Sequence, residues 1–263
     1  MPMEKCIARL ALDSGSILKE ARKLLAPRIQ QSSRREFLMR TLTLGGVAIL
    51  SGCSLTDDHN VETALSAISR WNDRTQGWIF NPDALAPTYP ENMITRPFPF
   101  NAFYGIDDAP TVAEADYRLE ITGLVADTHS WRLDELRSMP QIDQITRHIC
   151  VEGWSAIGRW GGLRFSDFLK RVGADTSAKY VGFKCADDYY TSIDMPTALH
   201  PQTLLALTYD GRTLPREYGF PMKLRMPTKL GYKNPKHIQA IFVTNTYPGG
   251  YWEDQGYNWF GGS

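Results

Sequence analysis

Seven short runs of strand-like composition follow one another between residues 117 and 244, and turn-forming residues separate them. Runs of this length and composition are typical of β-strands. No regular alternation of strand-like and helix-like segments accompanies them, which argues against a doubly wound parallel sheet. The pattern therefore predicts an α+β fold with mixed and antiparallel strands and short helices. The predicted strands cover residues 117–121, 144–150, 180–185, 189–193, 204–209, 222–226 and 238–244.

Three short helices are expected outside these strands. Their residues are 61–70, 133–136 and 165–173, where Gly173 ends the last helix. Five prolines between residues 82 and 99 predict that most of the segment 60–100 is extended and wraps around the domain.

The amino-acid composition is typical of a soluble globular chain with its own core, since 43% of the 263 residues are hydrophobic and 22% are charged. The formal net charge is zero, but the charges are unevenly distributed. Residues 1–52 carry nine lysines and arginines against four acids, whereas residues 53–263 carry 20 against 25. The basic excess lies at the front of the chain, where targeting signals are found.

Arg34 and Arg35 stand shortly before residues 41–50, an uncharged and weakly apolar run that contains two glycines. This run is shorter than the roughly 20 residues that a membrane-spanning helix needs, and it is typical of the apolar part of a signal peptide. Paired arginines in this position resemble the twin-arginine signal, which is read by a translocon that exports folded proteins. The alternative is the start of an ordinary basic amphipathic helix.

Residues 50–53, Leu-Ser-Gly-Cys, resemble the lipobox of bacterial lipoproteins, in which the bond before the cysteine is cut and its thiol is acylated. A buried or free cysteine beside small residues is the alternative. With acylation, the mature chain would be residues 53–263, held at the membrane through Cys53 and a polar tether at 54–60. We therefore expect an exported, periplasmic and membrane-anchored protein, and we assign no function to residues 1–32.

Cys150 is the most prominent candidate for chemistry in the mature chain. It ends a predicted strand and enters a loop, where sites are commonly built. Arg147 is near in sequence and would favour the thiolate, which is the form that acts as a nucleophile or as a ligand of a soft metal. Three alternatives stay open at this point: a buried structural cysteine, a disulfide with Cys185, and a nucleophile with His148 or His200 as its base.

A second feature is the basic segment, residues 212–236, in which seven cationic residues stand against the single acid Glu217. Four prolines and two glycines within it exclude a solvated helix face. We expect a loop-rich positive surface suited to phosphate or another compact anion. Nucleic acid is an improbable partner for an exported protein. The cations are Arg212, Arg216, Lys223, Arg225, Lys229, Lys233 and Lys236.

Several short motifs occur in an order and spacing that resembles the sulfite oxidase family of molybdopterin enzymes. The resemblance covers about residues 95–245, which is most of the mature chain, and it implies the sulfite-oxidase-like fold for the α+β domain. The motifs are Asn101-Ala102-Phe103-Tyr104, Cys150-Val151-Glu152-Gly153-Trp154, His200-Pro201, Leu214-Pro215, Gly219-Phe220-Pro221 and Gly231-Tyr232-Lys233.

The resemblance implies a molybdenum-molybdopterin cofactor whose metal binds two pterin sulfurs and the thiolate of Cys150. Cys150 would then be a metal ligand and not a nucleophile, with Arg147 as a second catalytic residue. Cys185 stands where the family pattern has threonine, so it is expected to line the pterin pocket and not to pair with Cys150. Lys223 replaces an arginine, which keeps the charge without the bidentate fork, and Tyr218 replaces an asparagine. The other positions expected to hold the cofactor are Asn101, Tyr104, Gly105, Asn234, Pro235 and Lys236.

The implied activity is oxygen-atom transfer on a small oxo substrate, with electrons exchanged with a separate protein such as a membrane haem or quinone-linked subunit. The twin-arginine translocon would be a further partner during export, because a bulky buried cofactor is inserted before the protein crosses the membrane. Nucleic acid is not expected as a partner. A non-catalytic lipoprotein that binds an anion or a partner through the same fold is the alternative.

Two kinds of substrate are compatible with the sequence. A sulfite dianion would need a cationic pocket, to which Arg147, Arg159 and Arg164 could contribute. A neutral sulfoxide would need an apolar wall, which Trp154, Trp160 and Tyr232 could supply.

The expected organisation has four parts. They are an export signal region at 1–52, a tether and wrapping segment at 53–94, a molybdopterin-binding catalytic domain at 95–246 and an aromatic C-terminal tail at 247–263. The tail would cover the mouth of the site, dock the electron partner or pack on the core.

Overall fold

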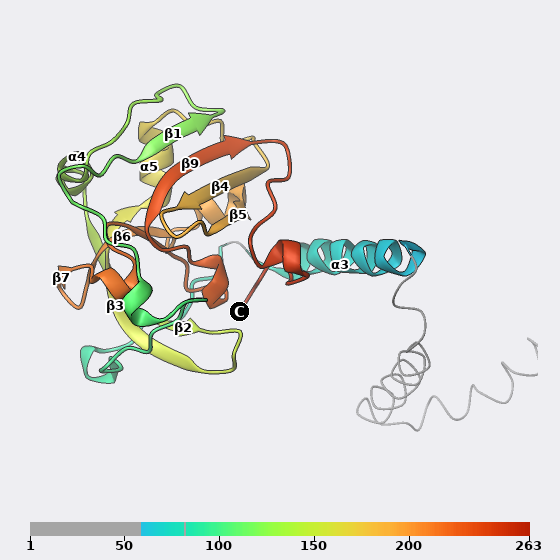
Figure 1. Cartoon of the computed structure of the whole chain (residues 1–263), viewed down its shortest axis with the longest axis horizontal. Coiled ribbons are helices and arrows are strands. Elements are labelled where there is room, and N and C mark those ends of the chain that lie inside the picture. Colours follow the sequence, from blue (N-terminus) through green and yellow to red (C-terminus); the bar gives the residue numbers. More distant parts are fainter. Residues whose placement is uncertain (1–58, 82) are drawn as a thin grey trace, which may run out of the picture. The chain divides into compact units, whose positions relative to one another are not determined.

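A computed structural model describes residues 59–81 and 83–263 (Figure 1). The predicted twin-arginine signal and lipobox lie outside the described residues. The chain divides into two units between Ala67 and Ile68, and the second unit, Ile68–Ser263, holds both sheets. No helix in the described part of the chain is both long enough and apolar enough to cross a membrane.

One sheet has four strands in the order β1, β9, β4 and β5 (Figure 1). These strands are β1 (Glu120–Gly123), β9 (Ile238–Thr244), β4 (Tyr180–Cys185) and β5 (Tyr190–Asp194). β1 runs parallel to β9, whereas β4 is antiparallel to both of its neighbours. One face of the sheet is buried in the main hydrophobic core, to which Val181, Phe183 and Ile241 contribute. This sheet supports the turn after β4, which reaches the site described below.

The second sheet is antiparallel and has the order β2, β3, β6 and β7, with β8 paired to β6. Its strands are β2 (Ile142–Ile149), β3 (Ser155–Arg164), β6 (Leu204–Tyr209), β7 (Arg212–Thr213) and β8 (Lys223–Arg225). The loop from β2 to β3 carries Cys150, and β8 carries two cations of the basic segment. The sheet therefore brings the two features singled out in the sequence to neighbouring positions.

The helices are short, with one exception. The α-helices are α3 (His59–Ile79), α4 (Leu133–Ser138), α5 (Phe165–Arg171) and α6 (Met195–Leu199). The 3₁₀ turns are η1 (Glu91–Met93), η2 (Ile106–Asp108), η3 (Arg216–Tyr218), η4 (Gly231–Lys233) and η5 (Glu253–Gln255). The predicted α+β class, with mixed and antiparallel strands and short helices, is confirmed.

The helix predicted at 61–70 is much longer in the structure and runs on to Ile79. Its last turns pack against the C-terminal tail, since the Asp73 carboxylate accepts hydrogen bonds from Asn258 Nδ2 (2.6 Å) and from the Phe260 backbone N–H (3.1 Å). Such tertiary contacts stabilise a helix beyond the span that local sequence predicts. The prediction that the segment 60–100 is extended after residue 70 was therefore wrong for residues 71–79.

Two strands were not predicted from the sequence: the two-residue β7 and the ten-residue β3. Three glycines and two arginines interrupt the apolar residues of β3, so the strand lacks the usual alternation. The glycines are required by close packing: a Cβ on Gly162 would lie 2.0 Å from the Leu205 carbonyl oxygen of β6. A register shift falls between Gly161 and Gly162, where the two strands approach. The glycines that make the sequence of β3 resemble a loop are thus explained by the close approach of the β3 and β6 backbones.

Candidate active site

A pocket opens between the loop after β2, the segment before η2, the turn after β4, the η4 region and the C-terminal tail. Both of the main features of the sequence contribute to its wall. Its lining residues are Asn101, Ala102, Phe103, Cys150, Val151, Glu152, Asp187, Tyr189, Lys223, Gly231, Tyr232, Asn234, Pro235, Lys236, Trp252 and Tyr257.

Cys150 lies in a tight turn at the end of β2. Its backbone N–H donates to the Trp154 carbonyl (2.9 Å), and Gly153 takes a φ of 91° that favours glycine. The residue is 7% exposed, and its Sγ lies 3.7 Å from Glu152 Oε2, which also accepts a hydrogen bond from Trp154 Nε1 (2.9 Å). Burial raises the pKa of the Cys150 thiol. A bound metal ion would reverse this, because a coordinating thiol is deprotonated.

Lys223 and Lys236 line the pocket together with this thiol, and Arg225 lies buried two residues from Lys223 in β8; we call the three residues the pocket cations. Lys223 and Arg225 are two residues apart in β8, so their side chains share one face of the strand. Lys223, Arg225 and Lys236 are 2%, 0% and 7% exposed, respectively. Charged side chains are rarely this buried without a counter-charge. Yet no carboxylate of the described chain lies within salt-bridge distance of any of the three.

Desolvation dominates the titration of these groups. Burial lowers the pKa of Lys223 well below its usual value, and the neighbouring Lys236 and Arg225 lower it further. Burial likewise lowers the pKa of Lys236 to about 8, against the opposing effect of Asp187 and Glu217. Arg225 donates to the Arg147 carbonyl (2.7 Å) and to Thr146 Oγ1 (3.1 Å), but its Nε has no partner. The wall is therefore built to receive an anion.

His148 is fully buried next to this wall. Its Nε2 lies 3.5 Å from Asn101 Nδ2, its Nδ1 has no partner, and burial with three nearby cations holds its pKa well below the usual value. No hydrogen bond joins His148 to Cys150, and His200 contacts the Ala84 carbonyl, outside the pocket lining. A cysteine nucleophile would thus lack the histidine base that the sequence suggested for it.

Asn234 and Gly231 shape the pocket by different means. The Asn234 carboxamide accepts from the Met226 backbone N–H (2.6 Å) and donates to the Leu230 carbonyl (2.9 Å), so its side chain holds the η4 region together. A Cβ on Gly231 would lie 2.8 Å from His148 Nε2. Close approach of the backbone at Gly231 is what allows Asn101, His148 and the η4 region to meet.

Tyr104, Gly105 and Cys185 lie near the pocket but do not form its surface. Tyr104 Oη donates to Asp187 Oδ2 (2.8 Å), and Asp187 does line the pocket. Gly105 precedes η2, and Cys185 is 6% exposed within the main core. Cys150 and Cys185 are both free thiols in the structure.

Arg147 is not brought into the pocket. Strand alternation turns it outward from β2, where its guanidinium lies 5.2 Å from the centre of the Tyr89 ring. Arg159 faces Asp143 (3.5 Å), and Arg164 is exposed at the end of β3. The three arginines considered for a sulfite dianion are therefore all absent from the lining.

The apolar side of the pocket differs from the one expected from the sequence. Trp160 is fully buried in a second core cluster and Trp154 does not line the pocket, whereas Tyr232 does. Sequence reasoning missed Asp187 and four aromatic residues of the lining. Phe103 belonged to a motif already singled out, but Tyr189 carried no signal of its own. The remaining two, Trp252 and Tyr257, lie in the tail whose role was left open.

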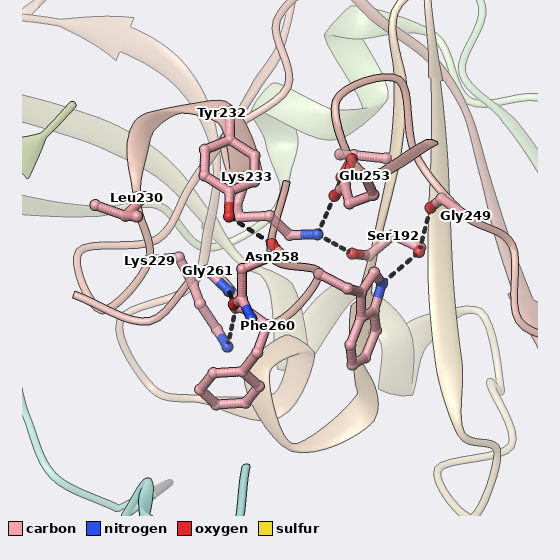
Figure 2. Close-up of polar contacts among 12 residues, drawn as sticks. Ser192, Lys229, Leu230, Tyr232, Lys233, Gly249, Glu253, Asn258, Phe260 and Gly261 are labelled. Carbon is pink, nitrogen blue, oxygen red and sulfur yellow. Dashed lines mark hydrogen bonds and ion pairs between the residues drawn. The ribbon is translucent and has the colours of Figure 1, made fainter. Parts of the chain in front are cut away.

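The tail, residues 247–263, is held to the basic segment by buried polar contacts (Figure 2). Lys233 Nζ forms an ion pair with Glu253 and donates to the Ser192 carbonyl (2.7 Å), and both charged side chains are 1% exposed. Lys229 Nζ donates to the Phe260 carbonyl (2.8 Å) and lies 3.2 Å from the centre of the Phe260 ring. The tail thus packs on the domain and also contributes to the pocket.

The basic segment is consequently not the positive surface that the sequence predicted. Lys223, Arg225, Lys229 and Lys233 are each at most 2% exposed. The prolines and glycines that excluded a helix serve to fold the segment inward, under the tail and beside the pocket. Some of its cations line the pocket and others bind partners inside the protein. Composition alone does not reveal this burial.

These residues fit a molybdopterin cofactor. The pocket offers one thiol as a metal ligand and two buried cations without carboxylate partners in the described chain, Lys223 and Lys236. Unpartnered polar atoms are buried close to its lining residues, at Arg225 Nε and His148 Nδ1. No group of three or more His, Cys, Asp and Glu side chains in the described residues could hold a metal ion by itself. A metal that brings two sulfur ligands on its own pterin needs only one from the protein.

A buried thiol in the wall of a pocket that also holds buried cations without carboxylate partners is typical of a protein that binds an anionic metal cofactor. The family model described as "Oxidoreductase molybdopterin binding domain" matches residues 107–252. Because the match covers more than half of the chain, the protein belongs to this family. It is a molybdopterin-dependent oxidoreductase, and molybdenum-molybdopterin is its cofactor.

Similar proteins carry related names. The chain is 68% identical over 247 residues to a "Putative protein-methionine-sulfoxide reductase subunit YedZ1" from Azospira oryzae, with 94% of each chain covered. It is 33% identical over 162 residues to the "Protein-methionine-sulfoxide reductase catalytic subunit MsrP" of Xanthomonas campestris, covering 56% of this chain and 50% of that one. The same-named subunit of Ralstonia nicotianae is 29% identical over 233 residues, with coverage of 74% and 69%.

Proposed function

We propose that the protein is an exported sulfoxide reductase, acting by oxygen-atom transfer at the pocket around Cys150. Methionine sulfoxide is the substrate class suggested by the names of the related proteins. Each turnover would consume two electrons and two protons, and would release a sulfide and water. A separate redox protein would supply the electrons.

The observation that carries this proposal is the composition of the pocket wall. Phe103, Tyr189, Tyr232, Trp252 and Tyr257 all line it, whereas none of the arginines that sulfite would need does so. Aromatic rings offer favourable contacts to sulfur and to apolar groups, worth about 0.3–1.5 kcal/mol for each sulfur contact. A neutral sulfoxide with an apolar substituent is better matched by this wall than a small dianion.

The residues of the chain would act mainly by positioning. When bound, the cofactor supplies the two-electron transfer of an oxygen atom. Cys150 would hold the metal, and the pocket cations would bind the anionic groups of the cofactor, most closely through Lys223 and Lys236. Glu152, fixed by Trp154 Nε1, would keep the Cys150 turn in place. The aromatic wall would orient the sulfoxide and keep water from the site.

We also propose export by the twin-arginine route and anchoring through an acylated Cys53. The support comes from sequence: Arg34 and Arg35, the apolar run 41–50 and the lipobox 50–53 stand in the expected order. The route is consistent with a cofactor that must be inserted before transport, because the translocon accepts folded proteins.

Cys150→Ser is the direct test. Wild-type protein should contain molybdenum and pterin, and should reduce the sulfoxide of N-acetylmethionine amide with an artificial electron donor. Cys150→Ser should lose that activity by about 100-fold or more, with loss or altered spectroscopy of the metal. Cys185→Thr replaces the second cysteine of the described residues, which does not line the pocket, and should keep the metal. Wild-type enzyme that oxidises sulfite but reduces no sulfoxide would overturn the assignment.

A further inference from the structure

The second half of α3 carries an apolar face that no described residue covers. Ile68, Trp71, Trp78 and Ile79 are 61%, 65%, 86% and 70% exposed. Because an α-helix turns by about 100° per residue, these four positions lie on one side of it. Single exposed apolar residues are ordinary, but two exposed tryptophans on one helix face indicate an interaction surface.

The opposite side of the same helix is fixed to the domain. Asp73 accepts two hydrogen bonds from the tail, and the Phe80 ring lies 5.2 Å from the Phe260 ring in an edge-to-face contact. Figure 1 shows the end of α3 beside the C-terminal segment, drawn in red. The helix is therefore held in one rotation about its axis. Its tryptophan face points away from the residues that hold it.

The exposed charges on this half of the helix are positive. Arg70 and Arg74 are exposed, and Asp73, the one acid between residues 68 and 79, is bonded to the tail. Tryptophan and arginine together suit the headgroup region of an anionic membrane. There the indole ring sits between apolar and polar layers, and each basic residue contributes about 1 kcal/mol.

The sequence before α3 also favours a membrane as the partner of this face. Cys53 lies six residues before the first residue of α3, a distance of at most about 20 Å when extended. An acylated Cys53 would therefore keep α3 close to the lipid surface. A second contact by a rigid helix would then be nearly intramolecular, which makes even a weak affinity effective.

We propose that the Ile68, Trp71, Trp78 and Ile79 face of α3 inserts into the headgroup region of an anionic phospholipid leaflet. The proposal rests on the export and lipidation proposed above. Acyl chains on a tether would leave the domain free to rotate above the membrane. A helix face in the interface would fix which side of the domain faces the lipid, and so where a membrane-bound electron donor meets it.

The placement is tested with lipidated, cofactor-loaded mature protein in vesicles that contain brominated phosphatidylglycerol. Bromine quenches tryptophan at short range, so wild-type fluorescence should fall. The fluorescence of Trp71→Phe/Trp78→Phe should hardly change, because its remaining tryptophans lie elsewhere. Equal quenching in the two proteins, or quenching in neither, would overturn the proposal and leave this face to a protein partner.

The affinity is tested without the acyl chains, in a Cys53→Ser chain exported on a leader whose removal needs no lipidation. Trp71→Ser/Trp78→Ser should lower its binding to phosphatidylglycerol vesicles at least about tenfold, because two indoles leave the interface. Arg70→Gln/Arg74→Gln should also lower it roughly tenfold, and only for anionic vesicles. Leu85→Ser removes an apolar side chain that is 64% exposed outside the helix, and should change nothing.

Two further measurements separate this proposal from those on which it rests. Mass spectrometry of the N-terminal peptide tests lipidation at Cys53, and its failure leaves the acyl-free experiment intact. Sulfoxide reduction with a soluble electron donor should be the same in wild type and in Trp71→Ser/Trp78→Ser, since neither residue lies in the pocket. A variant that binds vesicles as well as wild type does would contradict the inference, whatever its activity.

Discussion

The basic segment contains two groups of buried cations that are accommodated in opposite ways. Lys233 forms an ion pair with Glu253, and Lys229 donates a hydrogen bond to the Phe260 carbonyl. The pocket cations, represented by Lys223 and Lys236, have no carboxylate within salt-bridge distance in the described chain. Residues of one type, a few positions apart, thus stabilise the fold in one place and prepare a binding site in the other.

The two groups of cations differ in the source of their counter-charge, which is the protein's own tail for Lys233 and the cofactor for the pocket cations. A buried charge costs several kcal/mol unless it is paired, so the tail has to stay in place for Lys233 to be tolerated. For the pocket cations the counter-charge is the cofactor, whose binding would stabilise the folded protein by mass action. Removing the internal acid that pairs with Lys233 should therefore destabilise the protein, whereas removing the charge of a pocket cation should stabilise the protein without its cofactor.

The largest effect is expected from Glu253→Gln in the tail-anchored group. The change leaves the Lys233 ammonium buried without its carboxylate, and should lower the free energy of unfolding by about 3–5 kcal/mol. Urea unfolding of the protein without cofactor measures this. The tail carries Trp252 and Tyr257 into the pocket, so the KM for sulfoxide should rise as well.

Two controls sharpen this result. Glu114→Gln removes the acid of the exposed Arg137 pair and should cost much less, because water screens that pair. Glu253→Gln/Lys233→Met removes both buried charges and should recover part of the lost stability. If Glu253→Gln were no worse than Glu114→Gln, the anchoring role of the ion pair would be refuted.

A smaller, pH-dependent effect is expected at Lys229. Burial lowers the pKa of Lys229 to about 7, whereas an unfolded lysine titrates near 10.4. Between these values the unfolded chain binds more protons, so wild-type stability rises with pH across this window. Lys229→Met has no such group, and its stability relative to wild type should increase by about 2–4 kcal/mol as the pH falls from 10 to 7.

Urea unfolding at several pH values measures that difference, with the exposed Lys179→Met as its control. The control should follow the wild-type curve in parallel. A Lys229→Met curve that also stays parallel to wild type would show that Lys229 is as well solvated in the folded protein as in the unfolded one.

The strands that could be predicted from sequence are those whose residues agree with their environment. The bounds of β4, β6 and β9 are those predicted, because their apolar and aromatic runs are buried in a sheet. β3 could not be predicted, since its glycines reflect how closely β6 approaches and not a local preference. The length of α3 depends on the tail, which is nearly two hundred residues away in sequence.

The residues of the site also divide into those that the sequence could predict and those that it could not. Cys150, Asn101 and the pocket cations lay in motifs or in a charge cluster, and the structure brings them together. Asp187 carried no such signal, and Trp252 lay in an aromatic tail for which three roles stayed open, because what places both residues in the pocket is the packing of the turn after β4 and of the tail. The burial of the basic segment was also unpredictable, since lysine and arginine are normally exposed.

The smallest effect on stability, and the one most informative about the comparison, is expected from Lys223→Met. Lys223 lines the pocket but is only 2% exposed and has no carboxylate of the described residues within salt-bridge distance, so losing its charge should stabilise the cofactor-free protein by about 1–3 kcal/mol. The same change should lower molybdenum and pterin occupancy about tenfold, because an anion loses a charged partner. Urea unfolding and metal analysis measure the two quantities, and exposed Lys184→Met should alter neither. If Lys223→Met raises stability and lowers cofactor occupancy, Lys223 serves to bind the cofactor and not to stabilise the fold. If both fall, Lys223 stabilises the fold as Lys229 and Lys233 do, and the contrast between the two groups is refuted.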